Sequence, residues 1–305
     1  MTQSLPPLTA TIGALLLLCS SCVLSGTSRE FGPGRRVGIV QSELIREASG
    51  LVASRQSPGV LWVHNDSGDS ARVFAIDTQG KFLGTCHLRG AVARDWEDIA
   101  IGPGPDPNRQ YLYIGDIGDN RAKYPDITVY RVPEPAVNPS SSFGEMTIGP
   151  PDAIRLTYPD GPRDAETLLV DPLTRDLFVI SKREFFSKVY RAPWPQSTTQ
   201  PTRMERVATL PWGFAVAGDV SPDGRRVIVR GMFNASLWVR PAGQPLWHAF
   251  SGDPLRLPLM DEPQGEGICF DAKGAGYYTI GETAGLAPAP PLHYFGPAEP
   301  NTPQS

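Results

Sequence analysis

Short apolar runs, separated by turns rich in Gly, Pro and Asp, follow one another along the chain from about residue 36. Runs such as residues 60–63, 111–114 and 177–180 are rich in Val, Ile, Leu, Tyr and Phe, and each leads into a polar loop. Runs of this length and composition are typical of β-strands. No long segment after the first thirty residues has the 3.6-residue period of an amphipathic helix, so the pattern predicts an all-β protein.

The predicted strands fall into five repeats that share one order of parts. Each repeat starts with a small, polar or acidic residue two positions before an aliphatic anchor, passes through a turn into a second strand, and reaches a third strand after a polar loop. The anchors are Leu51, Ile99, Leu168, Val220 and Ile268. They are 48, 69, 52 and 48 residues apart, which is the spacing of β-propeller blades.

The ends of the repeats predict how the ring closes. A fourth strand is predicted over residues 83–88, 153–157, 206–210 and 246–250, but the fifth repeat ends at Phe295 without one. An unassigned apolar segment, residues 36–40, precedes the first repeat. We therefore predict a β-propeller of five four-stranded blades over residues 35–295, closed by N- and C-terminal strands that share one blade. A β-sandwich or two small all-β domains is the alternative, but neither explains a fivefold repeat.

Two sets of loops are expected to meet at one mouth of the central tunnel, because the loop before an innermost strand and the loop between the second and third strands lie on the same face of a blade. The first set supplies the residues two positions before the anchors, namely Ser49, Glu97, Glu166, Gly218 with Asp219 beside it, and Glu266. The second set supplies His64, Asp66, Asp69, Asp116, Asp119, Asn120, Arg121, Lys182, Arg183, Arg230, Asn234 and Glu282.

Three carboxylates at equivalent positions around a narrow tunnel repel one another, so a compensating charge is expected. Calcium accepts six to eight oxygen ligands in flexible geometry. The sequence therefore predicts an axial calcium site with Ser49, Glu97, Glu166 and Glu266, with Asp219 as a further candidate ligand. The alternative is that these glutamates pair with arginines or accept hydrogen bonds from loop amides.

The series Ser49-Gly-Leu, Glu97-Asp-Ile, Glu166-Thr-Leu and Glu266-Gly-Ile, with its spacing, resembles the calcium-activated soluble nucleotidases (apyrases). The resemblance implies a five-bladed propeller with one calcium held on the axis by Ser and Glu. Gly218 stands where that family has a side-chain ligand, so Asp219 or a water would have to take its place. The strings at residues 64–69, 95–99 and 115–120 also resemble a group of uncharacterised bacterial exported propellers.

The N-terminal segment is predicted to be an export signal. Residues 8–18 are almost wholly apolar but too short to span a bilayer, and small residues precede Cys22 as in a bacterial lipobox. We expect residues 1–22 to be the signal, Cys22 to be lipidated, residues 23–34 to be a linker and residues 296–305 a disordered tail. This places the protein in the cell envelope, with the lipid as its only membrane contact. An ordinary secretory signal is the alternative, since residues 1–11 contain no Lys or Arg and Cys19 replaces an aliphatic residue.

The net charge limits the kinds of partner that are expected, and the cysteine content limits the disulfides. The net charge of −4 and the absence of basic runs exclude nucleic acid as an expected partner. Cys86 and Cys269 are the cysteines expected in the folded part, and the sequence leaves open whether they pair.

Two functions stay open from the sequence. The first is a monomeric binding or scaffold module that holds a small molecule or an envelope protein at the tunnel mouth. The second is a calcium-dependent phosphohydrolase, in which an acidic loop residue orients water and a basic one neutralises phosphate oxygens. The acidic candidates are Asp66, Asp69, Asp116 and Asp119, and the basic ones are Arg121, Lys182, Arg183 and Arg230. No Gly-x-Ser-x-Gly motif occurs, so a serine triad is not expected.

Overall fold

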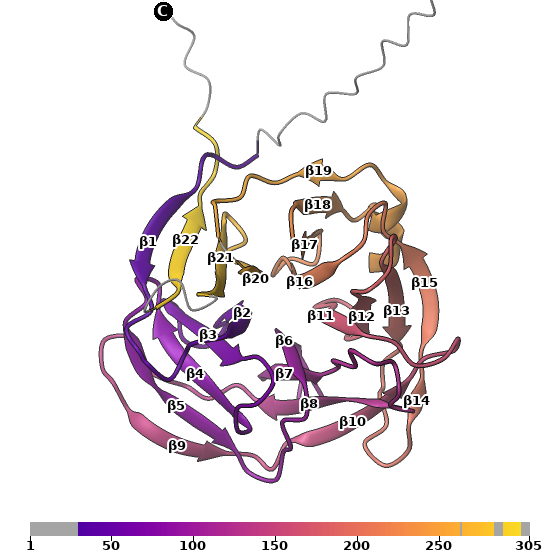
Figure 1. The fold of residues 1–305 in the computed structure, drawn as a ribbon, viewed down its shortest axis with the longest axis horizontal. Coiled ribbons are helices and arrows are strands. Elements are labelled where there is room, and N and C mark those ends of the chain that lie inside the picture. Colours follow the sequence, from indigo (N-terminus) through magenta and orange to yellow (C-terminus); the bar gives the residue numbers. More distant parts are fainter. Residues whose placement is uncertain (1–29, 263, 284–288, 300–305) are drawn as a thin grey trace, which may run out of the picture.

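Five mainly antiparallel sheets stand around a central axis in the computed structural model, which describes residues 30–299 except 263 and 284–288 (Figure 1). This arrangement confirms the predicted five-bladed β-propeller. The predicted signal segment with Cys22, and residues 300–305 of the predicted tail, lie outside the described residues.

Each blade has its first strand at the axis and its last strand at the rim. Blade 1 contains β2 (Ala48–Ala53), β3 (Val60–Asn65), β4 (Arg72–Asp77) and β5 (Phe82–Leu88). Blade 2 contains β6 (Trp96–Pro103), β7 (Gln110–Asp116), β8 (Ile127–Pro133) and β10 (Asp152–Thr157). Blade 3 contains β11 (Ala165–Val170), β12 (Leu177–Ser181), β13 (Lys188–Ala192) and β15 (Glu205–Thr209). Blade 4 contains β16 (Ala215–Val220), β17 (Arg226–Gly231), β18 (Ala235–Val239) and β19 (Leu255–Arg256).

Blade 5 joins the two ends of the chain. It contains β20 (Gln264–Phe270), β21 (Tyr277–Glu282), β22 (Pro291–Phe295) and, at its outer edge, β1 (Arg35–Ile39). Strand β1 runs antiparallel to β22, with Arg35 opposite Tyr294 and Ile39 opposite Pro291. The expected closure by N- and C-terminal strands is therefore confirmed, and the innermost strands β2, β6, β11, β16 and β20 contact one another in a complete ring.

Blades 1 and 2 carry a fifth strand that the repeat pattern did not predict. Strand β9 (Gly144–Ile148) pairs in parallel with β5, and β14 (Thr202–Arg203) pairs in parallel with β10. Each comes from the chain of the following blade and covers the outer edge of the preceding one (Figure 1). The segment that contains β9 lies between Ile99 and Leu168 and accounts for the wide spacing of those two anchors.

The prediction of a strand over residues 246–250 was wrong. Those residues form a 3₁₀-helix, η1 (Leu246–Ser251), and the outer strand of blade 4 is the short β19. Leu246, Ala249 and Phe250 are the buried residues of η1, and their spacing of three and four positions is helical. The Phe250 ring packs edge-on against Trp238, with ring centroids 5.4 Å apart.

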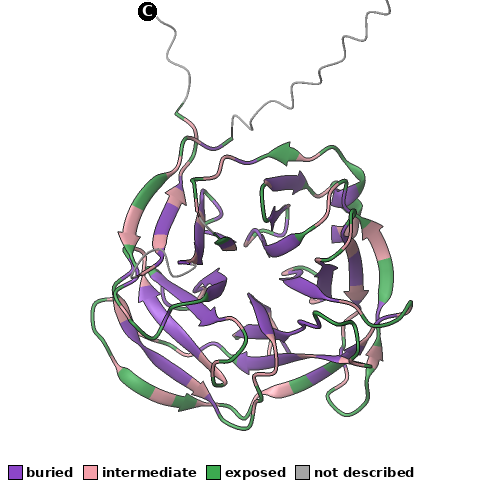
Figure 2. Ribbon diagram, viewed as in Figure 1, coloured by how far each residue is buried: buried purple, intermediate pink, exposed green. Residues whose placement is uncertain are grey.

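The hydrophobic core is divided into five clusters, one between each pair of neighbouring blades. The innermost strands are buried along nearly their whole length, whereas exposed residues appear on the outer strands (Figure 2). All five anchors are buried. Cys86 and Cys269 are buried in different clusters and are unpaired.

The closure generates a stability prediction. A chain that starts at Gln41 lacks β1 and the buried Phe31, whose ring packs against Tyr277 at 5.0 Å between centroids. It leaves the β22 edge and part of the core uncovered, so we expect Tm to fall by roughly 10 °C. Calorimetry compares it with a control chain that starts at Glu30 and keeps the whole of β1. Equal Tm values for the two chains would contradict the closure.

Candidate functional site

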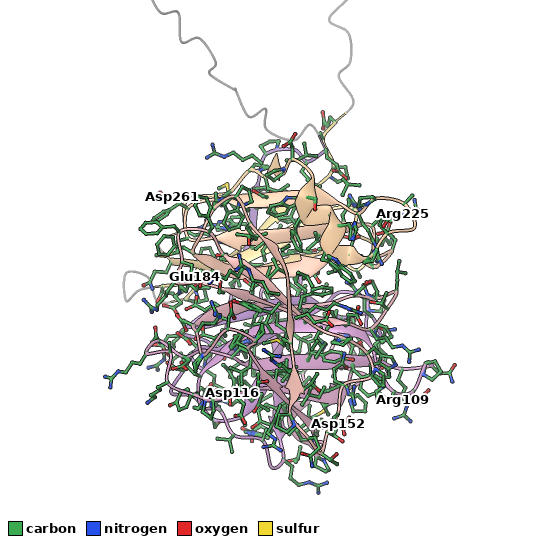
Figure 3. All side chains as sticks on the ribbon, turned by 90° about the vertical axis from the view of Figure 1, so that its right-hand side faces the viewer. Arg109, Asp116, Asp152, Glu184, Arg225 and Asp261 are labelled. Carbon is green, nitrogen blue, oxygen red and sulfur yellow. The ribbon has the colours of Figure 1, made fainter. Side chains whose placement is uncertain are left out.

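The loops that precede the innermost strands and the loops that join second and third strands meet on one face, which we call the mouth face. Asp66, on the β3–β4 loop, lies beside Asp95, which precedes β6, and Glu97, the second residue of β6. Lys182, on the β12–β13 loop, forms an ion pair with Glu166 of β11. Figure 3 shows Asp116, Glu184 and Asp261 on this side of the disc, with Arg109 and Arg225 on the opposite side.

A β-bulge re-aims one residue of each innermost strand. Glu97 has no partner in the register between β6 and β7, because Trp96 lies opposite Asp116 and Asp98 opposite Gly115. Glu166 and Glu266 are the extra residues of β11 and β20 in the same way. Since a bulge turns a side chain out of the ladder, these three glutamates occupy structurally equivalent positions.

Blade 4 departs from this pattern because its bulge lies earlier. The extra residue there is Val216, and Gly218 pairs regularly with Val229. The carboxylate of Asp219 accepts the N–H groups of Val220 at 2.8 Å and of Phe270 at 2.9 Å, and an oxygen lies 4.0 Å from the guanidinium of Arg55. Asp219 therefore joins blade 4 to blade 5, and its role as a ligand of an axial metal stays a prediction.

Asp98 holds the same position in blade 2 as Asp219 in blade 4. Its buried carboxylate accepts the N–H groups of Ile99 and Leu168 at 2.9 Å and of Gly218 at 3.3 Å. Three innermost strands thus converge on one side chain. Burial raises the pKa of Asp98 well above its usual range, although the three N–H groups lower it.

Two overlapping groups of carboxylates lie at the mouth. In each group the oxygen atoms all lie within 4.8 Å of one another. The first group, the outer triad, is Asp66, Asp95 and Glu97; the second, the inner triad, is Glu97, Asp164 and Glu166. Of the predicted calcium ligands, Glu97 and Glu166 belong to these triads.

Ser49 and Glu266 lie outside both triads. The Ser49 hydroxyl donates to the backbone carbonyl of Glu97 at 2.5 Å, which ties blade 1 to blade 2. Burial raises the pKa of Glu266, although the positive charges of Lys182 and Arg230 lower it. Glu266 therefore lies within the electrostatic field of the mouth without a direct ion pair among the described residues.

The two triads differ in their compensating charge. In the inner triad, Glu166 pairs with Lys182, and Asp164 accepts from Arg183 Nε at 2.7 Å. Among the described residues no ion pair involves Asp66, Asp95 or Glu97, whereas the nearby Arg94 Nε lies 3.9 Å from Asp116. The outer triad is thus the uncompensated one.

The pKa values reflect this crowding. Burial, together with the negative charges of Asp66, Asp164 and Asp116, raises the pKa of Asp95 to about 6. Burial raises that of Glu97 well above its usual range, and the charges of Glu166 and Asp66 add to the shift. Burial also raises the pKa of Glu166 to about 8, outweighing Lys182, and that of Glu282 to about 7.

A glycine leaves room beside the outer triad. A Cβ on Gly118 would overlap Glu97 Oε1 and Asp95 Oδ2. The backbone N–H of Gly118 donates to the Asp95 carbonyl at 3.2 Å, which fixes this glycine against the two carboxylates. Any larger residue at position 118 would occupy the space next to the carboxylate oxygens.

The other predicted site residues are mostly held in local contacts. His64 is buried, donates from Nδ1 to the Asn65 carbonyl at 2.7 Å, and packs edge-on against Trp96. Burial lowers its pKa. Asp69 accepts from Arg72 Nε at 3.0 Å, so neither residue reaches the triads.

Residues of β7 and of the β7–β8 loop contact the acidic residues of the mouth. Asp116 accepts the Asp95 N–H at 2.7 Å, and the Asp119 N–H donates to Asp164 Oδ1 at 2.9 Å. Asn120 accepts from Arg183, and Arg121 is exposed. On the far side of the mouth, Arg230 Nη1 pairs with Glu262 Oε2 at 2.6 Å, and Asn234 is half-buried.

The sequence analysis missed Asp95, Asp164 and Gly118. A signal for the first two was present, because each stands four positions before its anchor, two positions before a predicted glutamate. The role of Gly118 depends on a contact between two loops and leaves no such trace in the sequence.

Comparisons with known proteins assign no family. No family model matches the sequence, and no match is found among curated proteins. Among solved structures the chain is similar to hydrazine synthase of Kuenenia stuttgartiensis, at 15% identity and a TM-score of 0.37, over 79% of this chain and 78% of that one. Within the part of the chain that the structure describes, no helix is long and apolar enough to cross a membrane.

The raised pKa values predict how stability depends on pH. Because burial favours the protonated form of Glu166 more strongly than Lys182 favours the charged form, the folded state binds more protons than the unfolded state below about pH 8 and loses stability as pH rises. The lowered pKa of His64 makes stability increase with pH, but only below about pH 6.5, the ordinary pKa of histidine. Between about pH 6.5 and 8 we expect a loss on the order of 1–2 kcal/mol, measured as a fall in Tm in chelator.

The control for this measurement is Glu166→Gln, which should make the profile less steep in that range, while Glu282, with a pKa of about 7, still contributes. A wild-type Tm that stays level or rises between those pH values would show that Glu166 ionises as it does in the unfolded chain.

Proposed function

We propose that this propeller is a binding module that holds a divalent cation, calcium, in the outer triad and presents it to a ligand at the mouth face. The observation that supports the proposal is that Asp66, Asp95 and Glu97 bring carboxylate oxygens within 4.8 Å of one another without an ion pair among the described residues. A bound cation would compensate the repulsion that raises the pKa values of Asp95 and Glu97.

The donor chemistry fits a hard cation. All three side chains offer oxygen, which calcium prefers, and they come from two loops with unequal burial. Such an irregular set suits calcium better than magnesium, which requires near-octahedral geometry. Asp66 and Asp95 are partly exposed, so solvent or ligand oxygens have access to the remaining coordination positions.

The inner triad has a supporting role in this proposal. Lys182 and Arg183 neutralise Glu166 and Asp164, so a second cation next to Glu97 is not required. The exposed part of Arg183, and Arg121 on the neighbouring loop, supply positive charge for a ligand that offers carboxylate or phosphate oxygens to the metal.

Calcium should raise the Tm of the full chain after chelator treatment, because a cation that binds only the folded state stabilises it by mass action. Glu97→Gln removes a ligand charge, and Gly118→Ala fills the space beside the carboxylates while leaving all of them in place. Both should reduce the calcium-dependent rise in Tm to near zero.

Glu205→Gln is the matched control for this titration, because Glu205 lies on the outer strand β15 and is 60% exposed in its side chain. It should keep the full calcium response. If calcium leaves the wild-type Tm unchanged, the outer triad is not a calcium site. Release of phosphate from a panel of nucleotides is measured in the same samples. Release would indicate hydrolysis, whereas a calcium response without release would indicate binding alone.

We also propose that the chain is exported and anchored in the cell envelope through a lipid on Cys22. The support is the apolar run over residues 8–18 followed by small residues before Cys22. Metabolic labelling with a fatty acid should mark the wild type and not Cys22→Ala. Absence of label on the wild type would leave the ordinary secretory signal.

A further inference from the structure

Exposed apolar side chains gather on the loops of blades 3, 4 and 5 at the mouth face. Phe185 and Phe233 are 88% and 82% exposed, far more than a phenylalanine in a folded domain usually is. We call the set the aromatic rim; its members are Phe185, Phe186, Phe214, Met232, Phe233 and Met260. Glu184 and Asp261, their neighbours in sequence, lie on the mouth side of the disc in Figure 3.

Backbone hydrogen bonds join the loops of the rim. The Phe214 N–H donates to the Lys182 carbonyl at 3.0 Å, and the Phe214 carbonyl accepts the Met232 N–H at 3.2 Å. The loop of Phe214 thus lies between the loops of blades 3 and 4 that bear the other phenylalanines. Phe214 itself has a φ of 62°, a conformation that a bulky residue rarely adopts. Its backbone is held in place by hydrogen bonds on both sides.

The rim borders the acidic mouth directly. Lys182, which pairs with Glu166, starts the loop of Phe185, and Arg230 comes two residues before Met232. Both cations act on Glu266, which has no ion pair among the described residues. Glu282 is likewise unpaired there and lies within the field of Glu266 and Asp66. An apolar surface therefore adjoins carboxylates that form no ion pair among the described residues, although Lys182 and Arg230 act on Glu266.

The charge around the aromatic rim distinguishes between a lipid bilayer and a protein as the molecule that binds there. Surfaces that dock on bilayers surround their apolar side chains with Lys and Arg, which attract anionic lipids. Here the cations beside the rim are paired with carboxylates, Lys182 with Glu166, Arg183 with Asp164 and Arg230 with Glu262. The carboxylates of the outer triad add further negative charge, so the mouth would repel an anionic leaflet. Phenylalanine and methionine are enriched in the cores of protein interfaces, and carboxylates beside them complement a cationic partner.

We propose that the aromatic rim docks a partner polypeptide that places apolar side chains on the rim and a Lys or Arg beside Glu266 and Glu282. The inference deepens the proposed binding function by naming the class of partner, but it does not depend on the metal. The outer triad remains available to calcium, because Glu266 and Glu282 do not belong to it.

The test uses the full chain with Cys22→Ser, which cannot be lipidated, and a displayed library of short random peptides selected with calcium or with chelator. Selected peptides should combine aromatic or aliphatic residues with Lys or Arg. Their Kd, measured by fluorescence polarisation, should rise roughly tenfold or more for Phe185→Ser with Phe233→Ser. Glu266→Gln should weaken the same peptides severalfold.

Leu173→Ser is the matched control, since Leu173 is 61% exposed and lies next to Gly224, on the face opposite the mouth. It should leave Kd unchanged, and equal Tm values for the variants exclude unfolding as the cause of any loss. Selection that yields no peptide sensitive to the rim substitutions would overturn the inference.

A second arm measures sedimentation of the same protein with vesicles of phosphatidylcholine and phosphatidylglycerol. We expect no binding; binding that the two rim substitutions abolish would assign the rim to a bilayer and overturn the inference. If peptides still bind in chelator and calcium has no effect on Tm, the metal site is contradicted and the rim inference stands.

Discussion

The ring depends on buried carboxylates that hold innermost strands together. Asp98 accepts N–H groups from strands of blades 2, 3 and 4, and Asp219 does the same between blades 4 and 5. A carboxylate removed from water is costly unless it is fully hydrogen-bonded, and bonds from N–H groups to a charged acceptor are among the stronger ones. The strands are therefore fixed close to the axis, and the residues just before these aspartates are held close to one another.

This constraint explains why acids crowd at the mouth. The bulges of β6, β11 and β20 turn Glu97, Glu166 and Glu266 out of their ladders at the same level of three strands. Asp95 and Asp164, two positions earlier, reach the same space and complete the triads. Blade 4 lacks a carboxylate there because its bulge is displaced to Val216, so the charge around the axis is uneven.

The sequence predicted the features that repeat and missed those that depend on contacts between repeats. Alternation and spacing were sufficient for five blades, their strands and the closing role of β1. They could not predict β9 or β14, because each pairs with the preceding blade rather than its own. They could not predict the hydrogen bond from Phe270 to Asp219 either, because spacing alone does not reveal where a bulge falls, and a shift of one residue sends a side chain to the other face of a strand.

Two features of the mouth face do not help to close the ring. The outer triad concentrates uncompensated carboxylates, which lowers stability unless another charge is bound, and the aromatic rim leaves phenylalanines in water when each could have been polar. Residues that break the rules of folding without a compensating contact are those expected at binding sites. The two features lie on one face, while the cores between blades follow those rules. Their position argues that the mouth face, rather than the opposite one, is where this propeller meets its ligand.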